Sequence, residues 1–498
     1  MSLKKIIGSI LKWTARVFGI LLSVLILLAA IGILFTPDYT KKENPAGHPI
    51  NSTKYLTLDS QTKIWISVWL PKDLQSGETI PTVIQTSRYG NNFDPGWLYK
   101  AMQTYGIQPV MNYESAEPFL KNGYAYVWIQ SPGSCQSSGP RMAEYPPNEI
   151  DAMDAAIEWI IRQPWSNQRV GAMGGSYSGT TADVCCATLN PALKAVHSVA
   201  PDFDPYTVIR PGGLGSTEFI QTWVRMIRFM DEDNTAGILT LLDESETIPF
   251  WKRLFYRSLI RGLSRSKGND LAVFKQAMQD HRNTRSLYET LKEIEYKDQK
   301  TPDFDYAIED VAMYRHREKI ENAQVSTYTR AGWFDAEVAK GVLQKYLTFN
   351  TPQKLVIGPT GHNLKNIVNL YEEENGPSFA AAPQEICEEM FDFFDRHLKD
   401  GTAQKEKDPS EAPFVPLGIY HTFRKEDAEP LIPGEVTEIG ITLLPISNVF
   451  KKGHSIRIAV AGHDKAMKDR CPKEGVPEIT LQRNSVYPSR IILPVQVF

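Results

Sequence analysis

A serine between glycines is the residue of this sequence best suited to nucleophilic chemistry. Ser176 lies in the stretch GGSYSG at 174–179, after the apolar run RVGAM and before the small residues SGTTADVCC. A reactive serine between a strand and a helix needs a tight turn with small neighbours, so that its hydroxyl is exposed above the sheet. Here the glycine usual two places after such a serine is Ser178, with Gly179 one step later. Because ordinary strand-to-helix turns also contain these residue types, the serine alone leaves both interpretations open.

A nucleophilic serine needs a base to take its proton and an acid to orient that base. Asp335 ends the strand-like stretch STYTRAGWFD, and His362 ends KLVIGPTGH one strand later. Of the nine histidines, His362 is the one at such a position. Asp335 also directly precedes the helix-like EVAKG, where an aspartate can serve as an N-cap. The chain order Ser176, Asp335, His362 predicts a catalytic triad.

Strand-like and helix-like segments alternate on both sides of these residues. YLTLD and KIWISVWL predict a hairpin, and TVIQTS (82–87), YAYVWIQ (124–130), RVGAM and KAVHSVA predict short buried strands. Residues 149–163 place apolar side chains on one helical face. Strands that alternate with helices favour a mostly parallel α/β sheet.

This alternation divides the chain into segments. The sheet is predicted from residues 54–204 and again from 323–402, and the mainly helical stretch 205–322 between them predicts a lid. Residues 410–498 contain short strands and turns, which predict a separate C-terminal β-sandwich.

The N-terminus predicts a membrane anchor over residues 1–36 and a polar linker over 37–53. The run from Val17 to Phe35 is apolar, and at 1.5 Å per residue it matches a bilayer core of roughly 30 Å. Three lysines and one arginine precede the run, which favours a cytoplasmic amino end and an extracytoplasmic catalytic part, periplasmic or on the cell surface. A cleaved signal peptide is the alternative, but the run is long and lacks a small-residue cleavage site after it.

The composition is that of a folded globular protein. The formal net charge of −4 gives no reason to expect a nucleic-acid partner. The five cysteines lack metal-ligand spacing and are interpreted as small buried hydrophobic residues. The sequence contains no HExxH or CxxC, and GGLG at 212–215 does not follow a strand, so neither a metal nor an organic cofactor is predicted.

Several motifs together resemble one family. RYG at 88–90, GGSYSG, AGWFD and IGPTGH occur in this order, and the tail LLPISNVFKKGHSIRI is followed by PSRIILPV. In these motifs the chain, from Tyr55 to its end, is similar to the cocaine esterase / Xaa-Pro dipeptidyl-peptidase family of α/β-hydrolase serine hydrolases. The resemblance implies an α/β-hydrolase sheet with a helical lid and a C-terminal jelly-roll-like β domain.

The resemblance also implies roles for individual residues. Ser176 is expected as the nucleophile, His362 as the general base and then acid, and Asp335 as the orienting acid. The Tyr89 hydroxyl and the backbone N–H of Tyr177 are expected to form the oxyanion hole. A phenol remains protonated at neutral pH and can therefore donate there. Without the resemblance, Tyr89 would be interpreted as a loop aromatic at the sheet edge.

The sequence departs from the family pattern at three places. SPGSCQSSG, after the 124–130 strand, lacks the usual acidic and arginine residues. Thr360 replaces an aromatic residue before the histidine. The C-terminal β part is about half the expected size, so we expect a partial jelly roll.

The expected substrate is a small ester, an amide or a short peptide. Trp333, Trp223 and Glu337 are candidate substrate-binding residues. Glu337 lies where α-amino acid ester hydrolases carry one carboxylate for a substrate ammonium, but the next residue is Val338. Ester or acyl-amide hydrolysis is therefore ranked above Xaa-Pro dipeptidyl-peptidase or α-amino acid ester hydrolase activity. A non-catalytic binding protein with this fold is the alternative of another class, and a homo-oligomer is left open.

The stretch FWKRLFYRSLIRGLSRSK, from residue 250 to 267, is apolar on one helical face and basic on the other. Such a helix can lie on an anionic membrane surface. A lid helix with a solvated basic face has the same pattern, and the sequence favours that second interpretation.

Overall fold

The computed structural model describes most of the chain. The described residues are 3–35, 43–90, 93–104, 116–141, 144–234, 237, 249–265, 270–284, 287–301, 306–362, 364, 383–400, 421–441, 453, 455, 458, 460 and 478–492.

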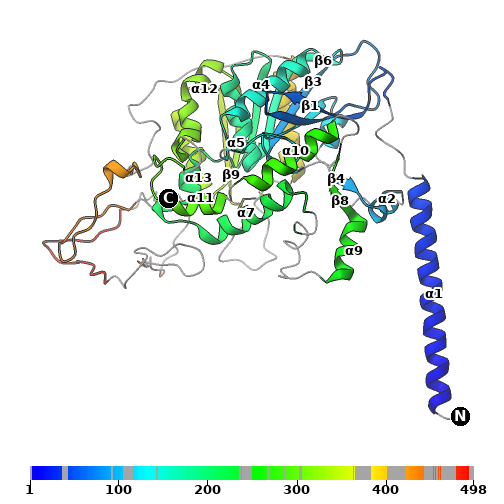
Figure 1. Ribbon diagram of the computed structural model, residues 1–498. Coiled ribbons are helices and arrows are strands. Elements are labelled where there is room, and N and C mark those ends of the chain that lie inside the picture. Colours follow the sequence, from blue (N-terminus) through cyan, green and yellow to red (C-terminus); the bar gives the residue numbers. More distant parts are fainter. Residues whose placement is uncertain are drawn as a thin grey trace.

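An eight-stranded, mostly parallel sheet forms the centre of the fold, in the order β1-β2-β5-β3-β6-β7-β9-β10 (Figure 1). The predicted hairpin is the antiparallel pair β1–β2, and β2 also pairs antiparallel with β5. All other neighbouring strands in this sheet run parallel. The strands are β1 (Asn51–Thr57), β2 (Lys63–Trp69), β3 (Ile80–Ser87), β5 (Ala125–Gln130), β6 (Ser166–Gly175), β7 (Leu193–Val199), β9 (Ser326–Gly332) and β10 (Gln353–Gly358). The predicted α/β fold class is confirmed.

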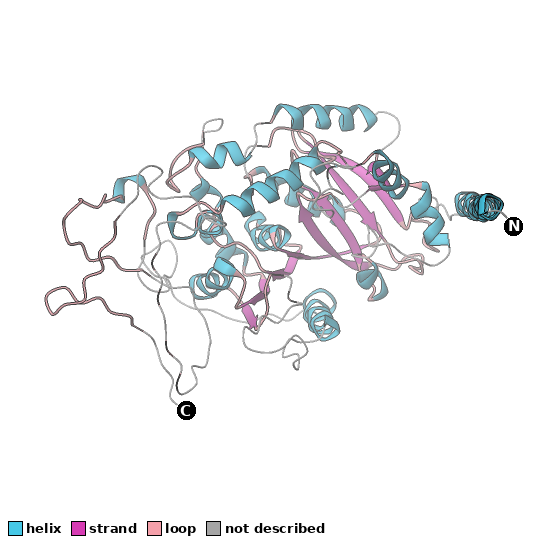
Figure 2. Ribbon diagram, turned by 90° about the horizontal axis from the view of Figure 1, so that it is seen from below, coloured by secondary structure: helices cyan, strands magenta, loops and turns pink. Residues whose placement is uncertain are grey.

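Helices cover both faces of the sheet (Figure 2). The connecting helices are α3 (Glu117–Lys121), α4 (Asn148–Ile161), α5 (Tyr177–Val184), α13 (Ala336–Thr348) and α14 (Pro383–Phe394). A 3₁₀ turn over Cys185–Thr188 continues α5, and a π-helical turn over Asp395–Asp400 continues α14.

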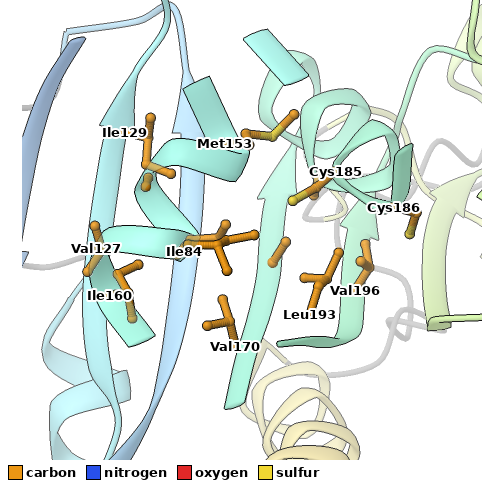
Figure 3. Close-up of a cluster of buried hydrophobic side chains, with 14 of the residues drawn as sticks. Ile84, Val127, Ile129, Met153, Ile160, Val170, Cys185, Cys186, Leu193 and Val196 are labelled. Carbon is orange, nitrogen blue, oxygen red and sulfur yellow. The ribbon is translucent and has the colours of Figure 1, made fainter. Parts of the chain in front are cut away.

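Successive residues of each strand face opposite sides of the sheet, so one strand contributes to two hydrophobic layers. Ile84 of β3 and Val127 of β5 lie in the cluster with α4 and α5, as Figure 3 shows. Val83 and Tyr126, their neighbours in sequence, lie in the cluster with α3 and α14. Burial on both faces explains why these strands are continuous apolar runs.

Most of the described cysteines behave as expected. Cys135, Cys185 and Cys186 are buried free thiols, but Cys387 on α14 is exposed, which corrects the expectation for that residue. Cys471 lies outside the described residues.

The chain between β7 and β9 is mainly helical, as its composition predicts. Its helices are α6 (Pro205–Ile209), α7 (Thr217–Asp231), α9 (Phe250–Leu259), α10 (Asp270–Asn283), α11 (Leu287–Glu293) and α12 (Arg317–Ala323). One short strand of this region, β8 (Ile260–Leu263), pairs with β4 (Phe93–Pro95) from the first half of the chain. His281 of α10 is buried, and its ring nitrogens contact the carbonyls of Asp231 and Ser137.

The predicted anchor forms one long helix, α1 (Leu3–Phe35), which extends away from the sheet in Figure 1. Helix α2 (Trp97–Thr104) contacts both α1 and α9. A search of the described residues found no helix with the length and apolar character that crossing a membrane requires. The membrane anchor stays a prediction.

Most of the predicted C-terminal β-sandwich lies outside the described residues. In its described part we find a 3₁₀ turn at Lys425–Asp427 and an isolated bridge between Arg483 and Pro488, but no strand. Arg424 pairs with Glu309 at 2.7 Å, so the start of this segment is attached to the region between β7 and β9. The boundaries and the shortened size of this domain stay predictions.

Candidate active site

Ser176 is the single residue between β6 and α5, and its backbone conformation is unusual. Its φ of 57° and ψ of −126° are rare for an L-residue. A Cβ atom on Gly174 would come within 2.2 Å of the Ser178 carbonyl oxygen, and one on Gly179 within 2.6 Å of the Val199 carbonyl oxygen. The turn can therefore close only with glycine at these two positions. The substitution of Ser178 for the usual glycine is accommodated, because Gly179 makes the close approach to β7.

The turn places Ser176 at the start of a helix. Its own N–H donates to Val199, and its carbonyl accepts from Gly179 at 2.9 Å and Thr180 at 3.0 Å. Tyr177 is the first residue of α5, and N–H groups in a first helical turn have no intrahelical acceptor. The backbone N–H of Tyr177 is thus suited to bind a developing negative charge next to Ser176.

Asp335 and His362 lie side by side after two neighbouring strands. His362 Nδ1 is 2.8 Å from Asp335 Oδ2 and 3.0 Å from Oδ1. Asp335 occupies the N-cap position of α13, but its side chain makes no capping hydrogen bond. Its carboxylate is directed to the histidine instead, so the side chain does not cap the helix, and its place in the triad stays a prediction.

The loops after β9 and β10 hold this pair together. Gly332 is paired in register with Gly358 at the strand ends, and Trp333 N–H donates to the Gly358 carbonyl at 2.9 Å. Phe334 N–H donates to the carbonyl of Thr360 at 3.1 Å. A Cβ on Gly332 would lie 2.0 Å from that same carbonyl oxygen, so the approach requires glycine.

Electrostatics favour a basic imidazole at His362. The hydrogen bond that His362 donates to Asp335 raises the pKa of His362 above its ordinary value, against the opposite effect of burial, and the nearby charge of Asp202 raises it further. Among hydrogen bonds between described residues, His362 uses Nδ1, and none joins it to Ser176. Such hydrogen bonds are often formed only when substrate is bound. Nε2 is therefore available for a proton from the reacting group.

Tyr89 lies two residues after β3, at the same edge of the sheet. Its ring contacts that of Tyr177 edge to face, with centroids 6.0 Å apart. Its hydroxyl accepts a hydrogen bond from Trp223 Nε1 at 2.8 Å. Burial raises the pKa of the Tyr89 phenol, so the group stays protonated at neutral pH and can donate.

Two family models match this sequence. Residues 59–363 match the model of the X-Pro dipeptidyl-peptidase (S15 family), a span that covers more than half of the chain and contains every residue named above. The chain belongs to the S15 family. Residues 398–492 match the X-Pro dipeptidyl-peptidase C-terminal non-catalytic domain.

Individual relatives are distant. A protein named as a serine esterase from Mycobacterium bovis is 24% identical over 373 residues, which cover 70% of this chain and 56% of that protein. Cocaine esterase from Rhodococcus is 24% identical over 355 residues, covering 70% and 57%. A CocE/NonD family hydrolase structure from Staphylococcus aureus has 16% identity and a TM-score of 0.47, with 73% and 55% covered. The chain spans about half the length of the relatives that it matches.

The departure from the S15 pattern at SPGSCQSSG is compensated by hydroxyl groups. Ser137 Oγ donates to the Gln130 carbonyl and accepts from Trp65 N–H. Ser134 Oγ donates to the Ser131 carbonyl, and Arg141 reaches the Pro132 carbonyl from further along the chain at 3.0 Å. The turn is therefore held by neutral hydrogen bonds and by charged side chains from elsewhere in the chain, Arg141 and Asp231 among them.

A buried polar network beneath Tyr177 was not predicted from the sequence. The Tyr177 hydroxyl donates to Glu149 at 2.7 Å and accepts from Arg141 at 2.7 Å. Arg141 also pairs with Glu144, and Glu144 pairs with Arg88. Arg88 and Tyr177 lie in the quoted motifs RYG and GGSYSG, but Arg141, Glu144 and Glu149 lie in a polar stretch whose sequence does not indicate burial.

Glu337, the candidate carboxylate for a substrate ammonium, is already engaged, as are Asp202 and Asp204 in the chain after β7. Glu337 lies 3.6 Å from Lys340, and Asp204 lies 3.7 Å from Lys297 in a pair that is almost wholly buried. Asp202 accepts a hydrogen bond from the Tyr145 hydroxyl at 2.7 Å. Lysines therefore neutralise Glu337 and Asp204, whereas the partner of Asp202 is a neutral hydroxyl.

The two candidate tryptophans differ in their contacts. Trp333 is half-buried in the loop that carries Asp335. Trp223, on α7, is hydrogen-bonded to Tyr89, and the Arg88 guanidinium lies 5.4 Å from the centroid of its ring.

Among the described residues, no group of histidine, cysteine and carboxylate side chains is arranged to hold a metal ion.

Proposed function

We propose that this chain is a serine hydrolase that cleaves ester or acyl-amide bonds through an acyl-enzyme intermediate. The observation that carries the proposal is the Asp335–His362 pair at the same sheet edge as a serine in a strained strand-to-helix turn. Parallel neighbouring strands carry all three residues at their carboxyl ends, which is where such sheets place ligands. Membership of the S15 family supports the same chemistry.

In the proposed first step, Ser176 Oγ attacks the substrate carbonyl carbon while its proton passes to His362 Nε2. The carbonyl π electrons move to the oxygen, which becomes an oxyanion near the Tyr177 N–H and the Tyr89 hydroxyl. When the intermediate collapses, the bond to the leaving alcohol or amine breaks, and that group takes the proton from His362. An acyl ester remains on Ser176.

In the second step, His362 takes a proton from water, and the resulting nucleophile attacks the acyl ester. The oxyanion forms again, and its collapse returns the proton to Ser176 and releases a carboxylic acid. Asp335 stays ionised and stabilises the imidazolium in both steps. Each oxyanion donor is worth about 2.7–4 kcal/mol in comparable sites.

Neutral acyl groups are the proposed substrate class. A substrate ammonium would need a charged carboxylate without a counter-ion, whereas Asp204 and Glu337 are paired with lysines and burial raises the pKa of Asp202. Breaking the buried Asp204–Lys297 pair would leave an unpaired charge, which costs about 3–5 kcal/mol. This favours esters and acyl-amides over the Xaa-Pro dipeptides and α-amino esters that require ammonium recognition.

The experiment is active-site labelling of the full chain with a fluorophosphonate probe. Wild type is expected to be labelled and to hydrolyse p-nitrophenyl butyrate, and Ser176→Ala is expected to lose both while remaining folded. If folded wild type reacts with neither reagent, a non-catalytic binding protein is the better description. Faster turnover of Xaa-Pro amides than of esters would reverse the substrate ranking.

We also propose that the chain is held at a membrane, with its catalytic part outside the cytoplasm. Supporting observations are apolar side chains exposed along α1, among them Phe18, Leu21 and Leu25. Helix α9 exposes Phe250 and Trp251 at 76% and 64% beside basic residues, a pattern typical of interfacial helices. Fractionation of cells that express the chain with and without residues 1–36 tests this location.

A further inference from the structure

The contact between Trp223 and Tyr89 joins the region between β7 and β9 to the candidate oxyanion hole. Trp223 lies on α7, and its Nε1 is 2.8 Å from the Tyr89 hydroxyl oxygen. An indole N–H can only donate a hydrogen bond. The Tyr89 oxygen must therefore be the acceptor, and this direction follows from chemistry alone.

This direction determines where the phenol proton can go. Because the Tyr89 oxygen accepts from Trp223, its own O–H must point to a different acceptor. Among the described residues, the Tyr89 hydroxyl makes no second hydrogen bond. Its proton is thus available for the oxyanion of the proposed reaction, and the accepted bond polarises the O–H, which makes it a stronger donor.

A second contact fixes the same helix to the residue before Tyr89. Asp231, the last residue of α7, pairs with the buried guanidinium of Arg88 at 2.5 Å. Asp231 also accepts from the Cys135 N–H at 3.0 Å. The Arg88 guanidinium lies over the Trp223 ring as well. Helix α7 therefore holds two consecutive residues of the loop after β3. Its Asp231 holds Arg88, and its Trp223 holds Tyr89.

We propose that Trp223 is a positioning residue for the oxyanion donor, supplied by α7, and not chiefly a wall of the substrate pocket. This inference rests on the proposed function, since it gives Trp223 a role in the same reaction. Trp223 acts through Tyr89: it holds the phenol ring and leaves the O–H free to donate. A consequence is that displacement of α7 from the sheet removes one oxyanion donor.

The kinetic experiment compares Trp223→Phe, which keeps an aromatic ring but removes the N–H, with wild type on p-nitrophenyl butyrate. We expect kcat to fall about tenfold, the order of one lost hydrogen bond, with KM nearly unchanged. In the Tyr89→Phe background, Trp223→Phe should have no further effect. Trp159→Phe on α4, remote from the site, is the matched control and should retain full activity.

A spectroscopic measurement does not depend on turnover. With tyrosine labelled at Cζ, the Tyr89 resonance is the one missing from Tyr89→Phe. We expect Trp223→Phe to shift this resonance and to raise the pKa of Tyr89, because the hydrogen bond from Trp223 lowers that pKa. Trp159→Phe should leave the resonance unchanged.

The two experiments distinguish a positioning role of Trp223 from a role in the substrate pocket. A raised KM with unchanged kcat, or an equal loss in both Tyr89 backgrounds, would make Trp223 a pocket residue and overturn the positioning role. An unshifted Tyr89 resonance would overturn it even in an active enzyme. If wild type shows no Ser176-dependent turnover, the proposed function fails, and the positioning role fails with it.

Discussion

Ser176 adopts a backbone conformation that costs an L-residue about 1–3 kcal/mol. The surrounding strand and helix fix this conformation through hydrogen bonds to the serine backbone on both sides. Strain of this kind persists only where neighbouring structure determines it, and it places the hydroxyl at the carboxyl edge of the sheet. The motif GGSYSG indicated the turn, but the structure supplies the φ angle that separates it from an ordinary loop.

At the same scale, the Asp335–His362 pair predicts a specific pH dependence. His362 can accept the Ser176 proton only when neutral, so activity falls as the pH drops through the pKa of His362. Since Asp335 raises that pKa, the acid limb of the kcat/KM profile should lie above the ordinary histidine value of about 6.5.

The variant Asp335→Asn tests this dependence. Without the carboxylate, the pKa of His362 should fall and the acid limb should move to lower pH. Because the amide also favours the wrong imidazole tautomer, kcat should drop by up to about 10⁴-fold. Measured pH–rate profiles of wild type and Asp335→Asn check the shift. An acid limb at the same pH in both proteins would show that His362 is not the base.

At the scale of elements, parallel strands bring residues that are distant in sequence to one edge. Tyr89 follows β3, Ser176 follows β6, Asp335 follows β9 and His362 follows β10. Their strands lie within one continuous parallel set. The order of strands, which no local pattern contains, therefore decides that these side chains meet.

Glycines at the close approaches predict a matched pair of variants. Gly174→Ala would place a methyl group 2.2 Å from the Ser178 carbonyl oxygen, so we expect a loss of about 1–3 kcal/mol in stability and a large loss of activity. Gly175→Ala has its nearest neighbour at 3.9 Å and should keep a wild-type melting temperature.

Thermal unfolding of the two glycine variants checks this difference. Equal melting temperatures would show that the turn can widen to admit a side chain. In that case the tight packing of β6 against α5 would not be what shapes the nucleophile turn.

At the scale of the whole molecule, the region between β7 and β9 is tied both to the sheet and to the C-terminal part. Asp231 pairs with Arg88 near the site, and Glu309 pairs with Arg424 beyond the sheet. Both arginines are at least partly shielded from water, which makes their ion pairs less sensitive to salt than surface pairs. Ion pairs as well as packing therefore connect the region between β7 and β9 to the sheet and to the C-terminal part.

The proposed membrane location is tested on the whole protein. In a bacterial host, we expect the full chain in the membrane fraction and the chain lacking residues 1–36 in the soluble fraction. Protease added to spheroplasts should digest the catalytic part, because that part is expected outside the cytoplasm. Full chain in the soluble fraction, or complete protection from protease, would contradict the location.

The sequence by itself determined the class of fold, and it indicated the residues of the candidate triad. Neighbouring residues in the sequence set the periodicity of strands and helices, and they also set the turns that carry Ser176, Asp335 and His362. Tertiary structure alone decided that Asp335 contacts His362 instead of capping α13, and that Asp204 pairs with Lys297. It also decided that Trp223 donates to Tyr89. The physical reason is that hydrogen bonds and ion pairs depend on distances of about 3 Å between segments that strand order and packing bring together.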